Sequence, residues 1–104
     1  MECYNVGRLI ERNWTVKPTS HQVSCELGGD VALLNLKTGT YYSLNPLGAR
    51  IWNLIQGGSS VEAILTTILA EYEVEPDRCE RDLFALLQEL YDTGLIEAHE
   101  PPSV

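Results

Sequence analysis

Residues 36–52 read LKTGTYYSLNPLGARIW and predict a turn, a strand and the start of a helix. Lys37-Thr38-Gly39 has the composition of a short hairpin turn, with Gly39 suited to a left-handed backbone conformation. Residues 40–44 favour a strand because they are rich in aromatic and β-branched types. Asn45-Pro46 then predicts a helix start, since asparagine is a strong N-cap and proline at the first helical position has no amide hydrogen to lose.

Two further strands are predicted before this turn. In residues 22–27 the side chains of Val23, Cys25 and Leu27 alternate with polar ones, which is typical of a half-buried strand with its apolar side toward the core. Gly28-Gly29-Asp30 predicts a turn. Residues 31–36 are more apolar, as expected of a central strand.

Three helices are predicted after the strands. Gly57-Gly58 ends the first helix. Ser59 is predicted to cap the second helix, because Glu62 three residues later completes a capping box. Pro76 opens the third helix, and Gly94 is the expected residue after its end.

The resulting order, β-β-β-α-α-α, predicts an α+β fold in which a three-stranded antiparallel sheet has helices against one face. The 104 residues are enough for one domain with a single modest core. We expect an N-terminal extension at residues 1–20, the folded domain at 21–97 and a flexible tail at 98–104.

The composition favours a folded cytoplasmic protein. Hydrophobic residues make up 44% of the chain, which argues against general disorder. No apolar run approaches the roughly 20 residues that span a bilayer, so no membrane partner is expected. The N-terminus mixes charged and apolar residues and lacks the pattern of a secretory signal.

The net charge of −8 is concentrated in the second half of the chain. Residues 1–50 hold four acidic and five basic side chains, whereas residues 51–104 hold eleven acidic and two basic ones. An acidic half disfavours nucleic acid as a partner, because phosphate binding depends on lysine and arginine. It serves either solubility or the docking of a basic partner.

No catalytic or metal site is indicated. Cys3, Cys25 and Cys79 lack the close spacing of metal ligands, so we expect reduced thiols, with Cys25 packed in a strand and Cys79 on a helix. His21 and His99 lie at opposite ends of the predicted domain, and neither has a local cysteine partner. We therefore predict no metal, no cofactor and no enzymatic activity.

The strand at residues 40–44 is last in the predicted meander and should have an unpaired edge. Adjacent strand residues point to opposite faces, so Tyr42 and Leu44 would face the core while Tyr41 and Ser43 face away from it. Open edges are usually guarded by charge or proline, and neither occurs here. An extended peptide can pair with such an edge through its main chain, unless an N-terminal arm already lies there.

Two segments resemble a PqqD-like domain, also called a recognition element for precursors of ribosomally synthesised, modified peptides (RiPPs). They are LLNLKTGTYYSLNPLGARIW at residues 33–52 and SVEAILTTILAEYEVEPDRCERDLFALLQELYDTGLIE at residues 60–97. The resemblance covers about residues 22–97. It implies a winged helix-turn-helix-like fold that binds the leader segment of a precursor peptide as a fourth strand, between the third strand and the third helix.

As a separate small chain, this sequence is most similar to the leader-binding proteins of lasso peptide pathways. The resemblance then implies a non-catalytic adaptor whose partners are the precursor leader, a separate leader protease and, in addition, a cyclase. Three alternatives stay open: a pyrroloquinoline quinone pathway chaperone for a radical-SAM enzyme, a winged-helix DNA-binding regulator and an orphan enzyme subunit. The acidic charge disfavours the DNA regulator, and the absence of a nucleophile–base pair disfavours the enzyme.

The resemblance also implies which residues line the peptide groove. Asp82 is expected to pair with a leader cation, and Cys79 and Leu86 to floor an apolar pocket. The whole expected set comprises Thr40, Tyr41, Tyr42, Ser43, Leu44, Arg78, Cys79, Asp82, Leu83 and Leu86.

Two other interpretations of the third helix are kept. In one, the opposite border, with Phe84, Gln88 and Tyr91, faces the peptide. In the other, Leu83 and Leu86 belong simply to the core, as such stripes often do.

Overall fold

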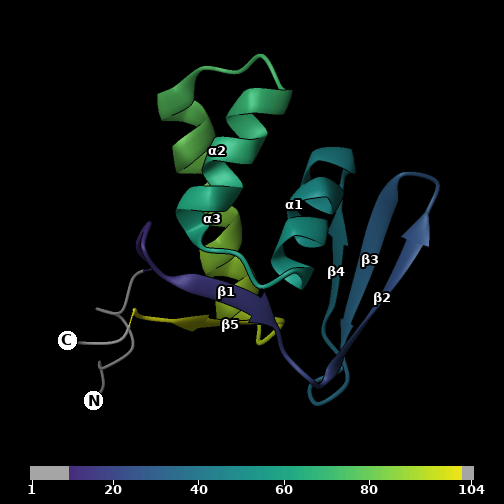
Figure 1. Ribbon diagram of the computed structural model, residues 1–104. Helices are drawn as coiled ribbons and strands as arrows, with labels where there is room; N and C mark the ends of the chain where they lie inside the picture. Colours follow the sequence, from purple (N-terminus) through teal and green to yellow (C-terminus); the bar gives the residue numbers. More distant parts are fainter. Residues whose placement is uncertain (1–9, 102–104) are drawn as a thin grey trace.

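The computed structural model describes residues 10–101 (Figure 1). The predicted order of three strands and three helices is confirmed, and one further short strand lies at each end of it. In chain order the elements are β1 (Thr15–Pro18), β2 (Gln22–Leu27), β3 (Asp30–Asn35), β4 (Tyr41–Leu44), α1 (Pro46–Gln56), α2 (Val61–Glu71), α3 (Pro76–Asp92) and β5 (Ile96–His99).

Strands β2, β3 and β4 form an antiparallel sheet in that order. The register places Leu33 of β3 between Ser24 of β2 and Tyr42 of β4. Helix α1 covers one face of this sheet, and α2 and α3 lie beyond it (Figure 1). Gly39 has a φ of 75°, so the turn before β4 takes the predicted left-handed conformation.

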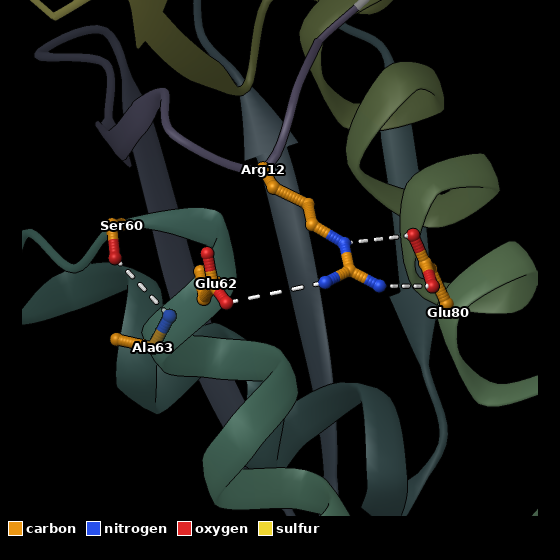
Figure 2. A network of polar contacts seen from close by, with 5 residues as sticks. All are labelled: Arg12, Ser60, Glu62, Ala63 and Glu80. Atoms are coloured by element: carbon orange, nitrogen blue, oxygen red, sulfur yellow. Dashed lines mark hydrogen bonds and ion pairs between the residues drawn. The ribbon is translucent and has the colours of Figure 1, made fainter. Parts of the chain in front are cut away.

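The helix starts follow from their capping residues. The Asn45 side chain accepts a hydrogen bond from the amide of Gly48 at 2.8 Å, as predicted for the start of α1. The prediction for α2 was wrong by one residue: Ser60, not Ser59, is the N-cap, and its hydroxyl accepts from the amide of Ala63 at 3.1 Å (Figure 2). Ser59 instead donates to the carbonyl of Leu54 at 3.1 Å, so its hydroxyl is used at the end of the preceding helix.

The strands β1 and β5 were not predicted. They pair antiparallel from Thr15 with His99 to Pro18 with Ile96. Val16 of β1 is fully buried. Each strand has only four residues, and its partner lies some eighty positions away, so no local pattern announces the pairing. The division at residues 20 and 97 stays a prediction, but β1 and β5 pack against the same core as the central elements.

Arg12 fastens the segment before β1 to two helices (Figure 2). Its guanidinium donates to both carboxylate oxygens of Glu80 on α3, at 3.0 and 2.6 Å, and lies 3.9 Å from Glu62 on α2. The hydrogen bonds from Arg12 hold the pKa of the Glu80 carboxyl below its ordinary value. The Arg12 carbonyl also accepts from the amide of Glu62 at 2.9 Å, so side chain and backbone together fix this segment.

The apolar side of β2 does not face the core, and this expectation was wrong. Val23 and Leu27 are 48% and 57% exposed, and Cys25 is exposed as well. Because Leu33 is buried and pairs with Ser24, the helix-covered face of β2 carries its polar residues. Helix α1 packs on β3 and β4, so β2 projects beyond the helices.

Asn35, at the end of β3, ties the β3–β4 turn to the end of α3. The residue is 2% exposed. Its side-chain carbonyl accepts from the amides of Lys37 and Thr38, at 2.9 and 3.3 Å, and its amide nitrogen donates to the Thr93 carbonyl at 2.8 Å. The last carbonyls of a helix have no partner within the helix, so Asn35 gives the half-buried Thr93 carbonyl a partner that the helix cannot supply.

Residues from the start of the domain bind the same turn after α3. The Thr19 hydroxyl donates to the Gly94 carbonyl at 3.0 Å, and the Thr19 amide donates to Leu95 at 3.1 Å. His21 Nε2 lies 3.0 Å from the Gly94 carbonyl, so the tautomer with a hydrogen on Nε2 donates to it. Three residues from two separate segments, Thr19 and His21 from one and Asn35 from the other, thus converge on residues 93–95.

Replacing Gly94 with alanine tests this convergence. Gly94 has a φ of 78°, and an added Cβ would lie 2.8 Å from Asn35 Nδ2. We expect Gly94→Ala to lower the free energy of unfolding by about 2–4 kcal/mol, from backbone strain and the disturbed Asn35 bond.

Gly28→Ala is the matched control, because Gly28 has a φ of 62° with no atom within 4 Å of an added Cβ. Only the strain of about 1–2 kcal/mol applies there. Chemical denaturation measures both variants. Equal losses would mean that Asn35 moves aside at no cost.

Candidate functional site

Among residues 10–101, strand β4 pairs with β3 on one edge and with no strand on the other. The Asn35 amide donates to the Thr40 carbonyl at 2.9 Å, which directs the main-chain groups of Thr40 toward β3. Because this direction alternates along an antiparallel strand, the amides and carbonyls of Tyr41 and Ser43 point outward. Strand β1 pairs with β5 rather than with β4, so no described residue of the N-terminal segment lies along this edge.

A cleft of about 780 Å³ lies between β4 and α3, with α1 and the α2–α3 loop completing its walls. Its floor is mostly apolar, from Ile51 of α1 and Ile68 of α2 to Leu83 and Leu86 of α3. Carboxylates lie at its rim. The full lining comprises Tyr42, Ser43, Leu44, Asn45, Leu47, Gly48, Ile51, Ile68, Glu73, Val74, Glu75, Arg78, Cys79, Asp82, Leu83 and Leu86.

Eight of the ten residues predicted for the groove line this cleft, and Thr40 and Tyr41 do not. Thr40 precedes β4, and its amide and hydroxyl bond to the Thr38 hydroxyl at 3.2 and 2.7 Å. Tyr41 is 64% exposed on the sheet face opposite the helices. Whether the eight residues bind a peptide stays a prediction.

The two borders of α3 face different clefts. Arg78 and Asp82 lie on the border toward β4, as proposed from the helical wheel. Phe84 and Gln88, on the alternative border, line a second cleft of about 730 Å³ beside Arg12. Only the first border therefore shares a cleft with the open edge.

Leu83 and Leu86 differ in their burial. Leu83 is 3% exposed and belongs to the core, whereas Leu86 is half-buried at the cleft. The alternative in which Leu83 and Leu86 are simply core residues therefore fits Leu83 only. Leu83 lies in the core and also forms part of the cleft floor.

The sequence analysis missed the contributions of α1, α2 and the loop between α2 and α3. Leu47 and Ile51 belong to the apolar stripe of α1, and Val74 to the loop. The apolar stripes of α1 and α2 predicted buried residues but not an open cleft. Ile51 and Ile68 are buried in the core and also border the cleft. A loop residue such as Val74 carries no periodic signal at all.

The cleft rim is negatively charged. Glu73, Glu75 and Asp82 line it, and Arg78 is the one basic residue of the lining. Arg78 Nε lies 3.9 Å from Asp82 one helical turn away, a loose and exposed contact. An extended ligand with a cation at this position would find favourable charge, whereas a phosphate backbone would not.

Tyr42 and Glu89 bridge β4 and α3 at the cleft. The Tyr42 hydroxyl donates to Glu89 Oε1 at 2.5 Å. Burial, and then the hydrogen bond and charge of Glu89, raise the pKa of Tyr42 to about 12. The phenol is therefore neutral at physiological pH, and its hydrogen bond links β4 to α3.

The described residues offer little for chemistry. Burial, and the nearby charge of Asp82, raise the pKa of the Cys79 thiol, which disfavours the reactive thiolate. Among residues 10–101 no three histidine, cysteine or acidic side chains are grouped to hold a metal ion. None of the helices described here is long and apolar enough to cross a membrane.

Comparison with known proteins gives a family and two related structures. The model of the family described as Coenzyme PQQ synthesis protein D (PqqD) matches residues 30–96. A structure described as TbiB1 in complex with the TbiA(beta) leader peptide is 41% identical, with a TM-score of 0.73, and the match covers 78% of this chain and 94% of that one. No curated protein matches the sequence significantly.

The second structure is described as lasso peptide synthetase B1 complexed with the leader peptide. It is 27% identical to this chain, with a TM-score of 0.70. The match covers 79% of this chain and 96% of that one. Both matches span nearly all of the solved proteins.

The Tyr42–Glu89 bond makes a testable contribution to the pH dependence of stability. The pKa of Tyr42 is raised in the folded state, so this contribution is fully present below the unfolded value of about 10 and is lost as pH rises through about 12. We expect Glu89→Gln to lower the pKa of Tyr42, as followed by ultraviolet absorbance or by nuclear magnetic resonance of its ring.

Asp92→Asn is the control, because Asp92 lies on the same helix but bonds to Gln88. It should leave the titration of Tyr42 unchanged. An unchanged titration in Glu89→Gln as well would show that burial alone raises the pKa of Tyr42.

Proposed function

Because the chain belongs to the PqqD family, we propose that it is a non-catalytic adaptor that binds the leader segment of a ribosomally synthesised precursor peptide. The observation that carries the proposal is the open edge of β4 beside an apolar cleft. Two solved proteins similar to this chain are described as complexes with leader peptides. The lasso peptide pathway is favoured, since one of these is a lasso peptide synthetase component.

In the proposed complex the leader adds a fourth strand to the sheet. Its main chain bonds to the outward amides and carbonyls of Tyr41 and Ser43. Every second leader side chain then points into the cleft, over Leu86 and the apolar residues of α1. Main-chain bonds supply affinity for any extended segment, so the cleft supplies selectivity for apolar side chains.

The adaptor's enzyme partners are part of the same proposal. A leader held on β4 must still reach a separate leader protease and, after cleavage, the core peptide must reach a cyclase. The cleft holds no nucleophile–base pair, which supports assigning the chemistry to those separate chains. The cytoplasm is the proposed compartment, where precursor peptides are made.

A second candidate is the chaperone of the pyrroloquinoline quinone pathway, which serves a radical-SAM enzyme. The description of the matching family favours it. The two candidates differ in the precursor peptide bound. Titration of the chain with a lasso leader and with a pyrroloquinoline quinone precursor, side by side, separates them.

Isothermal titration with the leader of the neighbouring precursor gene tests the proposal. We expect micromolar or tighter binding and no cleavage of the peptide by this chain alone. Ser43→Pro removes an outward main-chain donor and places a ring at the edge, so it should weaken binding by about tenfold or more.

Ser43→Ala is the matched control, because it removes the side chain but keeps the amide. Its affinity should stay close to that of the native chain. Denaturation of both variants checks the fold, since the Ser43 amide points away from β3 and bonds to no described strand. A folded proline variant that binds the leader with native affinity would contradict edge pairing.

The charge of the cleft rim gives a separate prediction. We expect the affinity for a leader with a lysine or arginine to fall as salt rises, and Asp82→Asn to weaken it by about two- to fivefold and to reduce this salt dependence. Asp77→Asn is the control, because Asp77 lies on the first turn of α3 and does not line the cleft. Identical effects of both variants would mean that only the overall charge matters.

A further inference from the structure

The Tyr42–Glu89 bond marks one end of the cleft between β4 and α3. Leu86 is the last residue of α3 that lines the cleft, and Glu89 lies on the next turn of the helix. Tyr42 lines the cleft from the strand side, and its hydroxyl donates to Glu89 Oε1 at 2.5 Å. A carboxylate therefore stands where the apolar part of the cleft stops.

The carboxylate of Glu89 can accept a further hydrogen bond. Its side chain is exposed, and no described residue bonds to the second oxygen, Oε2. A carboxylate accepts at both of its oxygens, so the phenol of Tyr42 uses only part of this capacity. Arg78, the basic residue of the cleft lining, lies about three helical turns away on α3. The negative charge of Glu89 is therefore open to a partner from outside the described chain.

A bond that only fastened β4 to α3 would not need this charge. The phenol of Tyr42 could donate equally to a neutral amide such as that of glutamine. Glu89 instead leaves a negative charge beside the strand edge to which the proposed leader adds. A peptide that covered this charge without offering a donor would bind less well, because an unpaired carboxylate loses its water at a cost. The position therefore discriminates between peptides.

The register of β4 shows which leader side chain meets Glu89. Tyr42 and Leu44 pair with Leu33 and Val31, and both of these β3 residues are buried, so Tyr42 and Leu44 share the helix side of the sheet. A strand added to β4 runs about 4.8 Å from it, with side chains that alternate between the two faces. One inward side chain then lies beside Leu44, over the apolar floor. The next inward side chain, two residues along the leader, lies beside Tyr42 and within reach of Glu89.

We infer that Glu89 selects a hydrogen-bond-donating leader side chain, lysine or arginine above all, two residues from the leader side chain that enters the apolar cleft. The inference rests on the proposed function and adds a polar specificity position to the apolar one. Glu89 contacts the leader, whereas Tyr42 is a positioning residue that holds the carboxylate through Oε1. A cation gives the strongest bond because both partners are charged, and a leader carboxylate at the same position is repelled.

A substitution scan of the peptide tests the inference. In the leader of the neighbouring precursor gene, lysine, leucine or glutamate replaces each residue in turn, and isothermal titration measures each affinity. The apolar position is the one that favours leucine and loses this preference in Leu86→Ala. Two residues from it, we expect lysine to bind about three- to tenfold more tightly than leucine, and glutamate about tenfold or more weakly than lysine.

Variants of the chain assign this preference to Glu89. Glu89→Gln should remove most of it, and Glu89→Lys should reverse it, so that glutamate binds better than lysine. Tyr42→Phe breaks the same bond between β4 and α3 but keeps the carboxylate, so the order of lysine, leucine and glutamate should persist. Asp82→Asn is the matched control: Asp82 lies about two turns away on α3, and its loss should leave the preference at this position unchanged.

The outcomes separate the inference from the function beneath it. If no peptide of the series binds the native chain, the proposed function fails. If the leader binds but no lysine preference lies two residues from the apolar position, or Glu89→Lys leaves the order unchanged, the inference about Glu89 is overturned and the adaptor function stands. Equal weakening of every peptide by Tyr42→Phe and Glu89→Gln would reduce the bond to a structural tie and overturn the inference as well.

Discussion

The structure depends on the satisfaction of the backbone groups at the end of α3 by residues far away in the sequence. Asn35 binds the Thr93 carbonyl while holding the β3–β4 turn, and Thr19 and His21 bind the Gly94 carbonyl. Without these bonds, polar groups near the core would lie unpaired at a cost of about 1–3 kcal/mol each. The same bonds fix where β4 lies relative to α3, and therefore how wide the cleft between them is.

The cleft combines a packed frame with a sheet that has an open edge among the described residues. The Tyr42–Glu89 bond joins strand to helix, and α1 buries its stripe beneath both. On the edge of β4, the outward main-chain groups of Tyr41 and Ser43 nevertheless pair with no strand in the described part of the chain. A ligand strand can therefore complete the sheet without rearranging the core, so little ordering of the protein opposes binding. The acidic rim adds a preference for cations that acts through charge rather than shape.

Much of the fold was predictable because its signals are local. Hairpin glycines, the Asn45 cap and the apolar stripes located β2, β3, β4 and all three helices. The candidate cleft was predictable only in part: the open edge and the Arg78–Asp82 border followed from sequence reasoning and family resemblance. The walls from Leu47 and Val74 did not, because their place beside β4 depends on how the helices cross. The prediction that the apolar side of β2 faces the core was wrong for a related reason. Alternation of apolar and polar residues identifies a strand, but it does not show which face the helices cover.

The sequence by itself determined the positions of β2, β3, β4 and the three helices to within a residue or two, and that one half of the chain is acidic, because capping, turn formation and charge need only near neighbours. Tertiary structure alone decided the pairing of β1 with β5, the tie from Asn35 to Thr93 and the exposure of Val23 and Leu27. These features join or separate residues some sixty to eighty positions apart. Their energies arise from packing and hydrogen bonds that form only once the chain has folded, so no local pattern encodes them.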